Sequence, residues 1–437
     1  MTGTSTTWGQ LMDGELRRRR RIIIRRAMKT LRVTHRWVSL LVGILLVVIT
    51  TSGTILLLEP DLRVLAHESY FHTTHSAHPI TPDRALAAAR RAYPKAGAPQ
   101  SVIYQRGVYQ VSLGATSTTS TETLVNIDPG SGRVLGAIRP DRGILGFVQN
   151  LHECGLSCAG YPGYIGLMAH DMPGLGIPGL NKIEIGNFIL GSFGFILGLL
   201  VLSGVVLWWP GLRRWRRGFQ VRASKGRYAR DYDLHKLIGI VALPMLAMWA
   251  LTGANFELPV VSNIVYGIIG DKPAPSPSFS SVKVPNGTPQ ITIARAEQIA
   301  LKLVPGSTMV GTNLPSPAND PTSTFSVWES HGIDPSRDSD YPGQVEVAVD
   351  RHTGAAKVIN GQLGRPLRQT IWTNWTTGMH YGSFVGWIPR LVWVGFGLTP
   401  LALAFTGLST WLYKRRKRQN ASRRKRAKAT GAQALKV

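Results

Sequence analysis

Four long apolar stretches do most to limit what this chain can fold into. They cover residues 37–58, 185–209, 237–256 and 388–413. Each has the ~20 residues that a helix needs to cross the roughly 30 Å hydrocarbon layer of a bilayer. Because backbone polar groups in lipid must be bonded within the segment, each stretch is predicted to be a membrane-spanning helix. The polar segments 60–184 and 257–387 between them are of domain size, so membrane and aqueous parts alternate.

The net charge of +26 lies in three short segments beside these stretches. Residues 1–36 hold 10 Lys/Arg and 2 acids, the loop 210–236 holds 9 and 2, and the tail 414–437 holds 11 and none. Short basic flanks stay in the cytoplasm, so both termini and this loop are predicted to be cytoplasmic, with both polar segments outside. An excess confined to membrane ends argues against nucleic-acid binding.

The arginine run at 17–21 and the basic tail are predicted to be disordered and to face anionic lipids. The first apolar stretch is longer than the core of a signal peptide and has no small-residue cleavage site. It is therefore expected to remain as a membrane anchor.

Matching phrases indicate that the chain is internally duplicated. Thr34-His35-Arg36-Trp37 opens the first apolar stretch, and Leu234-His235-Lys236-Leu237 opens the third. In each case a glycine follows the histidine by 18 residues, or about five helical turns, so both lie on one helix face. Ser203-Gly204 and Thr406-Gly407 occupy equivalent places in the second and fourth stretches. Each half is predicted to cross the membrane, form an outer domain and cross back.

The two outer segments share one pattern, a helix followed by strands. Residues 81–91 and 291–300 are typical of helices, while 101–113, 125–135 and 345–354 are typical of antiparallel strands with glycine turns. The predicted fold is integral membrane α-helical: a four-helix bundle from an internal duplication, with two α+β domains outside. A Gly/Pro-rich insertion at 153–182 distinguishes the first half.

Four histidines stand at equivalent places in the two halves. His35 and His235 lie at the cytoplasmic ends of the first and third stretches, and His152 and His380 precede the second and fourth. A six-coordinate haem iron needs one axial ligand on each side of the ring, which two related helices can supply. An isolated boundary histidine is more often an interfacial polar residue. Two symmetric pairs instead favour two bis-histidine haem sites, one at each membrane face.

The absence of a Cys-x-x-Cys-His motif predicts that both haems are non-covalent haem b. A porphyrin lying flat against a helix needs small residues along that face. The glycines predicted to pack against haem are Gly43, Gly53, Gly239 and Gly253.

The first outer segment offers other metal-ligating side chains. They are His67, His72, His75, His78 and His170, with Met168 and Met172 beside the last. Imidazole and thioether groups could hold iron or copper. Solvated loop histidines and methionines packed on the membrane surface are the simpler interpretation.

Cys154 and Cys158 are the two cysteines of the chain, and both would face an oxidising compartment. A disulfide is favoured over a metal site. In a helix, however, this spacing is near the upper limit of disulfide reach.

These marks resemble the PepSY-associated transmembrane family of bacterial inner-membrane proteins. The resemblance rests on a basic residue after the first histidine, Leu151-His152 before the second stretch, Gly204-x-x-x-Trp208 at its end, and Asp-x-x-x-Gly turns at 128–132 and 350–354. The outer segments are similar to PepSY domains. Within the family, the pattern is similar to di-haem ferric-siderophore reductases.

That resemblance implies an electron path across the membrane. Electrons would come from a cytoplasmic donor protein or from quinol, and the acceptor would be a periplasmic ferric siderophore or similar ferric chelate, with iron(II) released for uptake. The basic loop 210–236 would suit an acidic donor such as flavodoxin or ferredoxin. The insertion at 153–182 departs from the family pattern and leaves the identity of the acceptor open.

Two other classes of function also fit the sequence. A non-enzymatic membrane regulator would bind an envelope partner through its outer domains and would be colourless when purified. A transporter of an iron chelate or of copper would move its substrate through the bundle without an electron donor.

Overall fold

The structure is a computed structural model of the chain. It describes residues 8–114, 122–173, 182–269, 278–285, 287–316, 320–331, 344–360, 372, 376–382 and 387–434. The chain divides into two compact units. The first, here called the basic unit, comprises Met1–Thr50, Phe195–Ala247 and Leu398–Val437; the second, here called the sheet unit, comprises Thr51–Gly194 and Met248–Gly397.

Long apolar helices dominate the chain outside the sheet. Among the described residues, three helical spans are long and apolar enough to cross a membrane: Arg18–Leu56, Ile185–Trp208 and Arg390–Arg424. The first belongs to α1 (Trp8–Leu56), the second is α5, and the third runs through α12 (Trp387–Gly397) and α13 (Thr399–Ala434). These spans agree with three of the four predicted stretches.

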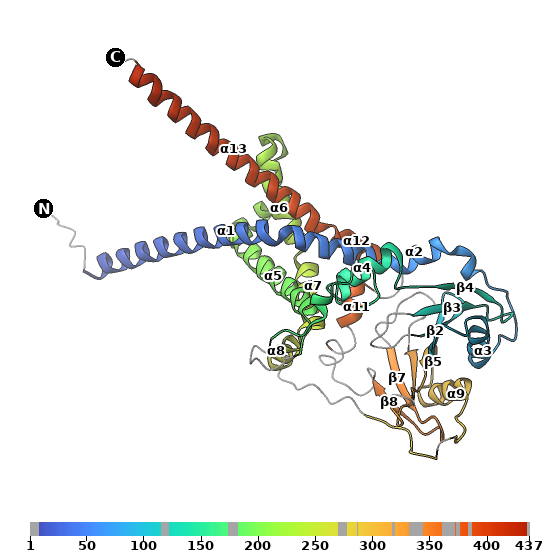
Figure 1. Ribbon diagram of the computed structural model, residues 1–437. Helices are drawn as coiled ribbons and strands as arrows, with labels where there is room; N and C mark the ends of the chain where they lie inside the picture. Colours follow the sequence, from blue (N-terminus) through green and yellow to red (C-terminus); the bar gives the residue numbers. More distant parts are fainter. Residues whose placement is uncertain are drawn as a thin grey trace. The chain divides into compact units, whose positions relative to one another are not determined.

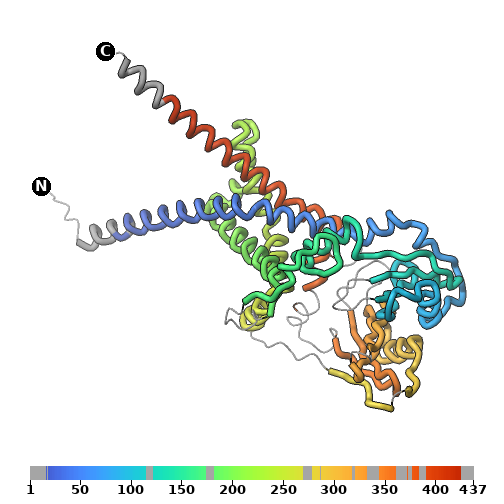
Figure 2. Tube along the Cα trace, in the orientation of Figure 1, coloured from blue at the N-terminus to red at the C-terminus, as the bar shows by residue number. Residues whose placement is uncertain are grey.

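The basic ends of the chain differ from the prediction. Helix α1 begins at Trp8 and includes the arginine run at 17–21, and α13 continues to Ala434. Figure 2 shows the coloured parts of both helices. The predicted disorder of these segments was therefore wrong. Arginine and lysine are good helix formers, and adding residues to an existing helix avoids the cost of nucleation.

The third predicted stretch is bent. Helix α6 (Arg227–Val241) and helix α7 (Leu243–Glu257) meet at an angle of 61°, and together they have the length and composition of a fourth span. Pro244 is the second residue of α7. It has no N–H to donate to the preceding turn, and its ring crowds the carbonyl there, which accounts for a sharp bend at this point.

The sheet unit contains one antiparallel sheet whose strands come from both halves of the chain. They are β1 (Pro99–Gln105), β2 (Val108–Leu113), β3 (Thr123–Ile127), β4 (Val134–Ile138), β5 (Ser307–Asn313), β6 (Phe325–His331), β7 (Gln344–Val349) and β8 (Ala356–Asn360). The strand order is β4-β3-β2-β1-β5-β6-β7-β8. Helices α3 (Pro82–Ala92) and α9 (Ile293–Leu303) pack on this sheet (Figure 1).

Each half therefore has the predicted order of one helix and then antiparallel strands, but the halves share a sheet instead of forming two separate domains. Strand β1 pairs with β5 through Ser101↔Asn313, Val102↔Thr312 and Ile103↔Gly311. Pairing covers two edges that would otherwise expose unbonded backbone groups. The sequence pattern within each strand carries no information about which strand lies beside it.

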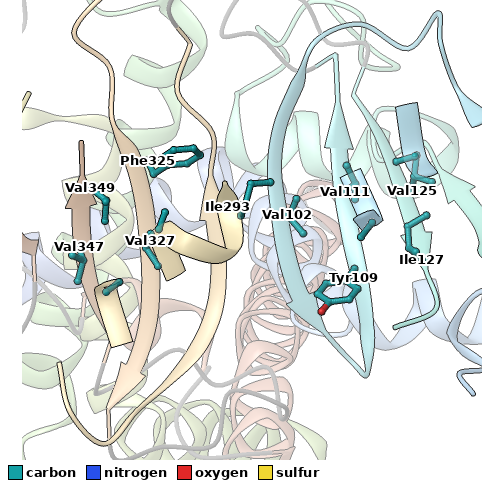
Figure 3. Packing of buried hydrophobic residues seen from close by; sticks show 14 of the residues in the cluster. Val102, Tyr109, Val111, Val125, Ile127, Ile293, Phe325, Val327, Val347 and Val349 are labelled. Atoms are coloured by element: carbon teal, nitrogen blue, oxygen red, sulfur yellow. The ribbon is translucent and has the colours of Figure 1, made fainter. Parts of the chain in front are cut away.

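A single apolar core lies between the sheet and its two helices. Side chains at alternate strand positions point into it, including Val102 and Val111 from the first half and Val327 and Val347 from the second, all fully buried. Figure 3 shows this cluster together with Ile293 of α9. Burying a valine contributes roughly 1.5–3 kcal/mol, so the shared core joins the two halves more firmly than the three backbone pairs alone.

The N-terminus of helix α9 is bonded by a side chain from the other half of the chain. The carboxylate of Asp83, on α3, accepts hydrogen bonds from the backbone N–H groups of Ile293 (2.8 Å) and Ala294 (3.0 Å). Helix N-termini favour carboxylates, because the first N–H groups lack partners within the helix.

The Asp-x-x-x-Gly turns anchor the segment before each helix. Asp128 accepts hydrogen bonds from the backbone N–H groups of Thr74 and Gly130, each at 3.0 Å. Asp350 accepts a hydrogen bond from the backbone N–H of Val282 at 2.7 Å. Burial alone would raise the pKa of Asp128. The hydrogen bonds from Thr74, Gly130 and Ser131 favour its carboxylate and hold the pKa at about 2.

The remaining elements are α2 (Glu59–Ala66), α4 (Gly143–Glu153), α8 (Pro259–Ile269), α11 (Thr376–Tyr381), and the 3-10 helices η1 (Glu68–Phe71), η2 (Gly166–Ala169), η3 (Leu212–Phe219) and η4 (Ala223–Lys225).

Candidate functional site

In the basic unit, His35 of α1 and His235 of α6 are each hydrogen-bonded through Nδ1. The Nδ1 atom of His35 lies 2.8 Å from the hydroxyl of Ser203 on α5. The Nδ1 atom of His235 lies 3.1 Å from the hydroxyl of Thr406 and 3.1 Å from the carbonyl oxygen of Leu403, both on α13.

In the sheet unit, His152 and His380 repeat this arrangement. Nδ1 of His152, on α4, lies 3.2 Å from the hydroxyl of Ser52, and Nδ1 of His380, on α11, lies 2.8 Å from that of Thr252. The two ring centres are 6.2 Å apart. The indole of Trp249 donates to the backbone carbonyl of His380 (3.0 Å), which fixes α11 beside α7.

The direction of these hydrogen bonds follows from the other bonds of the hydroxyl groups. Ser203, Thr252 and Thr406 each donate their own proton to a carbonyl of the preceding helical turn, at 3.0, 2.8 and 2.8 Å. Each hydroxyl can therefore only accept from the imidazole, so Nδ1 carries the proton. The opposite nitrogen, Nε2, then keeps a free lone pair. This is the tautomer in which histidine binds a metal.

A glycine follows each of the four hydroxyl residues and lies beside the same imidazole. A methyl group at Gly204 would lie 3.8 Å from Cε1 of His35, and one at Gly407 would lie 3.4 Å from Cε1 of His235. At Gly253 the distance to Cε1 of His380 would be 3.6 Å, and at Gly53 the distance to Cε1 of His152 would be 2.5 Å. One dipeptide, Ser-Gly or Thr-Gly, thus supports a histidine in four places.

The four glycines predicted to pack against haem divide into two groups. Gly53 and Gly253 lie beside the imidazoles of the sheet unit. A methyl group added at Gly239 would lie 3.7 Å from the side chain of Leu403. A methyl group added at Gly43 would meet no atom of the described chain within 4 Å. The sequence repeat includes Gly204 and Gly407 but does not identify them as neighbours of a histidine.

The other predicted metal ligands do not come together. Among the described residues, no three His, Cys, Asp or Glu side chains are placed to hold a metal ion. His67 stacks on Tyr70 with ring centres 5.0 Å apart, and His72 lies 3.7 Å from the carboxylate of Glu68 in an exposed pair. His75 lines a shallow hollow beside Gly130, and His78 is exposed.

His170 is also exposed and hydrogen-bonds the carbonyl of Gly166 through Nδ1 (2.7 Å). Met168 and Met172 are half-buried and lie on either side of it in the chain. The part of the insertion that follows, 174–181, lies outside the described residues.

Cys154 and Cys158 form a disulfide, with Cα atoms 5.6 Å apart. Cys154 is the residue after α4, so the pair is not confined to helical geometry. The fully buried Asn150 holds the bridged loop: its side-chain oxygen accepts from the N–H of Cys158 (3.1 Å), and its amide donates to the carbonyl of Pro162 (3.1 Å). The loop stabilises the end of the helix that carries His152.

A cavity of about 220 Å³, lined by both polar and apolar side chains, adjoins the same helix. Gln149 and Glu153 of α4 line one side, and Arg63 of α2 with Gln105 and Gln110 of the sheet line others. Burial raises the pKa of Glu153 and lowers that of Arg63. The charge of Arg63 opposes the first shift by lowering the pKa of Glu153, and the charge of Glu153 opposes the second by raising the pKa of Arg63. The cavity can offer amide and charged groups to a polar molecule.

The apolar helices define a multi-pass membrane protein with a β-sheet domain. The chain belongs to the family described as the PepSY-associated TM region, whose model matches residues 32–414. It is also 34% identical over 103 residues to an uncharacterized protein of Pseudomonas aeruginosa. That match covers 23% of this chain and 25% of the relative, so the chain aligns with about a quarter of the relative's length.

Proposed function

We propose that this protein is a di-haem b reductase of a bacterial inner membrane. It takes electrons from a cytoplasmic donor protein or from quinol and delivers them to a periplasmic ferric siderophore or similar ferric chelate. Iron(III) in the chelate gains one electron, and iron(II) is released for uptake. The proposed topology has four spans with both termini inside, because the three basic segments then all face the cytoplasm.

One observation carries this proposal: the imidazoles have Nδ1 bonded to a hydroxyl and a glycine at Cε1. A histidine needed only for packing or surface polarity does not require the same tautomer and the same small neighbour in each half of the chain. Metal-binding histidines usually have such a hydrogen bond, because the bond at one ring nitrogen fixes the ring and directs the other nitrogen to the metal.

The residues present fit haem. Two metal–nitrogen bonds of about 2.0 Å plus the radii of two imidazole rings add up to roughly 6 Å, and the ring centres of His152 and His380 are 6.2 Å apart. Haem held by such a pair supplies reversible one-electron iron chemistry. His35 and His235 would hold the second haem.

The chain's other residues have distinct parts in this proposal. Ser203, Thr406, Ser52 and Thr252 orient the imidazoles. The apolar helices exclude water, which limits side reactions of the transferred electron. The polar side chains in the cavity beside α4 would contact a ferric chelate, and the exposed arginines of η3 favour an acidic donor.

The visible spectrum of the purified full chain tests the proposal. We expect a Soret band and, in a pyridine haemochrome assay, two haems per chain. Replacing His35 or His235 by alanine should remove one haem, and replacing His152 or His380 should remove the other. His72→Ala is the matched control, because this exposed loop histidine should be dispensable. A colourless protein obtained with adequate haem supply would refute the proposal.

A second experiment separates a reductase from a protein in which haem is only structural. The haems are reduced with dithionite, excess reductant is removed, and a ferric chelate is added. We expect the haems to be reoxidised and iron(II) to be captured by a ferrous-specific chelator. If the haems stay reduced after the ferric chelate is added, the protein is not a ferric-chelate reductase.

A further inference from the structure

Arg36 directly follows His35 on α1 and has an unexplained polar atom. Its Nε is buried and has no hydrogen-bond partner among the described residues. Its guanidinium carbon lies 5.6 Å from the ring centre of Trp37, a cation–π contact that leaves the Nε hydrogen without an acceptor. A buried charged donor without an acceptor is costly to leave, so an acceptor is expected at this position.

Two of the four acids of the same unit, Asp231 and Asp233, are already bonded elsewhere. Asp231 accepts hydrogen bonds from the hydroxyl of Ser409 (2.5 Å) and the guanidinium of Arg230 (3.0 Å). Asp233 accepts from Arg222, at 2.7 Å and 3.0 Å. Both carboxylates therefore belong to other ion pairs.

The two remaining acids of the basic unit are too distant. Asp13 and Glu15 precede Arg36 by at least 21 residues on the same continuous helix. At about 1.5 Å per residue, this places them roughly 30 Å along the axis. No carboxylate of the basic unit is therefore placed to pair with Arg36 in the described part of the chain, so an anion bound from outside the polypeptide is the acceptor we consider.

We propose that Arg36 binds a carboxylate of the haem held by His35 and His235, an inference that rests on the proposed function. Haem b carries two carboxylates on one edge of its ring. A residue adjacent to an axial ligand can reach that edge, and the planar guanidinium matches a carboxylate with two parallel hydrogen bonds. Arg36 would then fix the rotation of the ring about the iron–histidine axis, which His35 and His235 alone leave free.

The test compares haem b with its dimethyl ester, in which both carboxylates are neutral. The full chain carrying His152→Ala and His380→Ala retains the relevant site and is produced in haem-limited cells. Each compound is titrated into the protein in neutral detergent and followed at the Soret band. The double-alanine protein with Arg36 intact should bind haem b at least ~10-fold more tightly than the ester, as expected for a bond to a charged group. Arg36→Gln should remove this preference.

Arg32→Gln is the matched control. It removes the same charge one helical turn earlier, at an exposed position, and should leave the preference intact. Equal far-ultraviolet circular dichroism among the variants checks that they are folded. Arg36→Lys keeps the charge but loses the paired donors, so it should show an intermediate preference.

A preference that persists in Arg36→Gln, or that is absent when Arg36 is intact, overturns the inference but leaves the haem proposal standing. Failure of the otherwise unaltered chain to bind haem b overturns both. A lipid phosphate is the other possible source of the anion. In that case Arg36→Gln would lose stability selectively in phosphatidylglycerol nanodiscs while still preferring haem b to the ester, which also overturns the inference.

Discussion

Gly53→Ala should remove one haem while leaving the helices intact. Gly53 lies on α1 beside the imidazole of His152, and a methyl group there would be 2.5 Å from Cε1 and 2.8 Å from Nε2 of that ring. Alanine favours a helix over glycine by about 1 kcal/mol. The substitution therefore strengthens α1 locally and acts on the ligand, not on the fold.

The size of the displacement follows from the distances. To restore an ordinary contact of 3.4 Å, the ring of His152 must move by about 0.9 Å. Metal–nitrogen bonds tolerate deviations of only about 0.2 Å, so the bond to a haem iron cannot persist once the ring has moved this far. We expect haem binding at His152 and His380 to weaken beyond the ~10–100-fold that loss of a supporting contact costs.

The assay is the haem-to-protein ratio, with electron paramagnetic resonance of the low-spin signals. Gly53→Ala should lower the ratio from two to about one and remove one signal. Gly253→Ala is the matched control at the equivalent position of α7, where the methyl group would lie 3.6 Å from His380 and should be tolerated. Two intact low-spin haems in Gly53→Ala would refute the reasoning.

Three further predictions concern the sheet unit. Burial raises the pKa of Glu297 from 4.5 to about 7 despite hydrogen bonds that favour its carboxylate. As pH rises, this carboxyl group ionises in the unfolded chain before it does in the folded one, so the free energy of unfolding should fall by about 3 kcal/mol between pH 4.5 and 7. Glu297→Gln should abolish this pH dependence in thermal melts. Asp61 bonds the nearly buried Arg390 at 2.9 Å, and because the carboxylate is half-exposed, Asp61→Asn should cost only about 1–2 kcal/mol in urea unfolding; an unchanged midpoint contradicts this. Replacing Cys154 and Cys158 by serine should cost about 2 kcal/mol by loss of loop closure and speed haem loss to apomyoglobin, whereas an unaltered rate of loss would exclude support of the ligand loop.

The sequence predicts individual helices and strands well but not how strands from different halves associate. Periodicity identifies the helix beginning near Thr81 and the strand around Val102, because side-chain spacing reflects which face is buried. It does not distinguish an edge strand that remains exposed from one that pairs with β5. The sequence also does not predict the bend before α7, although Pro244 is present there, because a proline can be accommodated in a membrane helix without breaking the span.

The same limit applies to the candidate site. Symmetry of the sequence was enough to select His35, His235, His152 and His380. It was not enough to show that Gly204 faces a histidine, because spacing identifies residues on one face of a helix and not the residue opposite on its neighbour. The recurrence of Ser-Gly or Thr-Gly in every long apolar stretch was the available signal. The suggested metal ligands His67, His72, His75 and His78 had no such repeat in the second half.

The shared sheet has a consequence for any shorter protein built from one half. Such a protein would leave β1 open along its length, with backbone groups that need a partner. Two identical copies could satisfy each other by antiparallel association of β1 with β1 about a twofold axis, since antiparallel pairing is self-complementary. A one-half relative is thus expected to be an obligate homodimer, and in the present chain the covalent link between the halves removes any dependence of assembly on protein concentration.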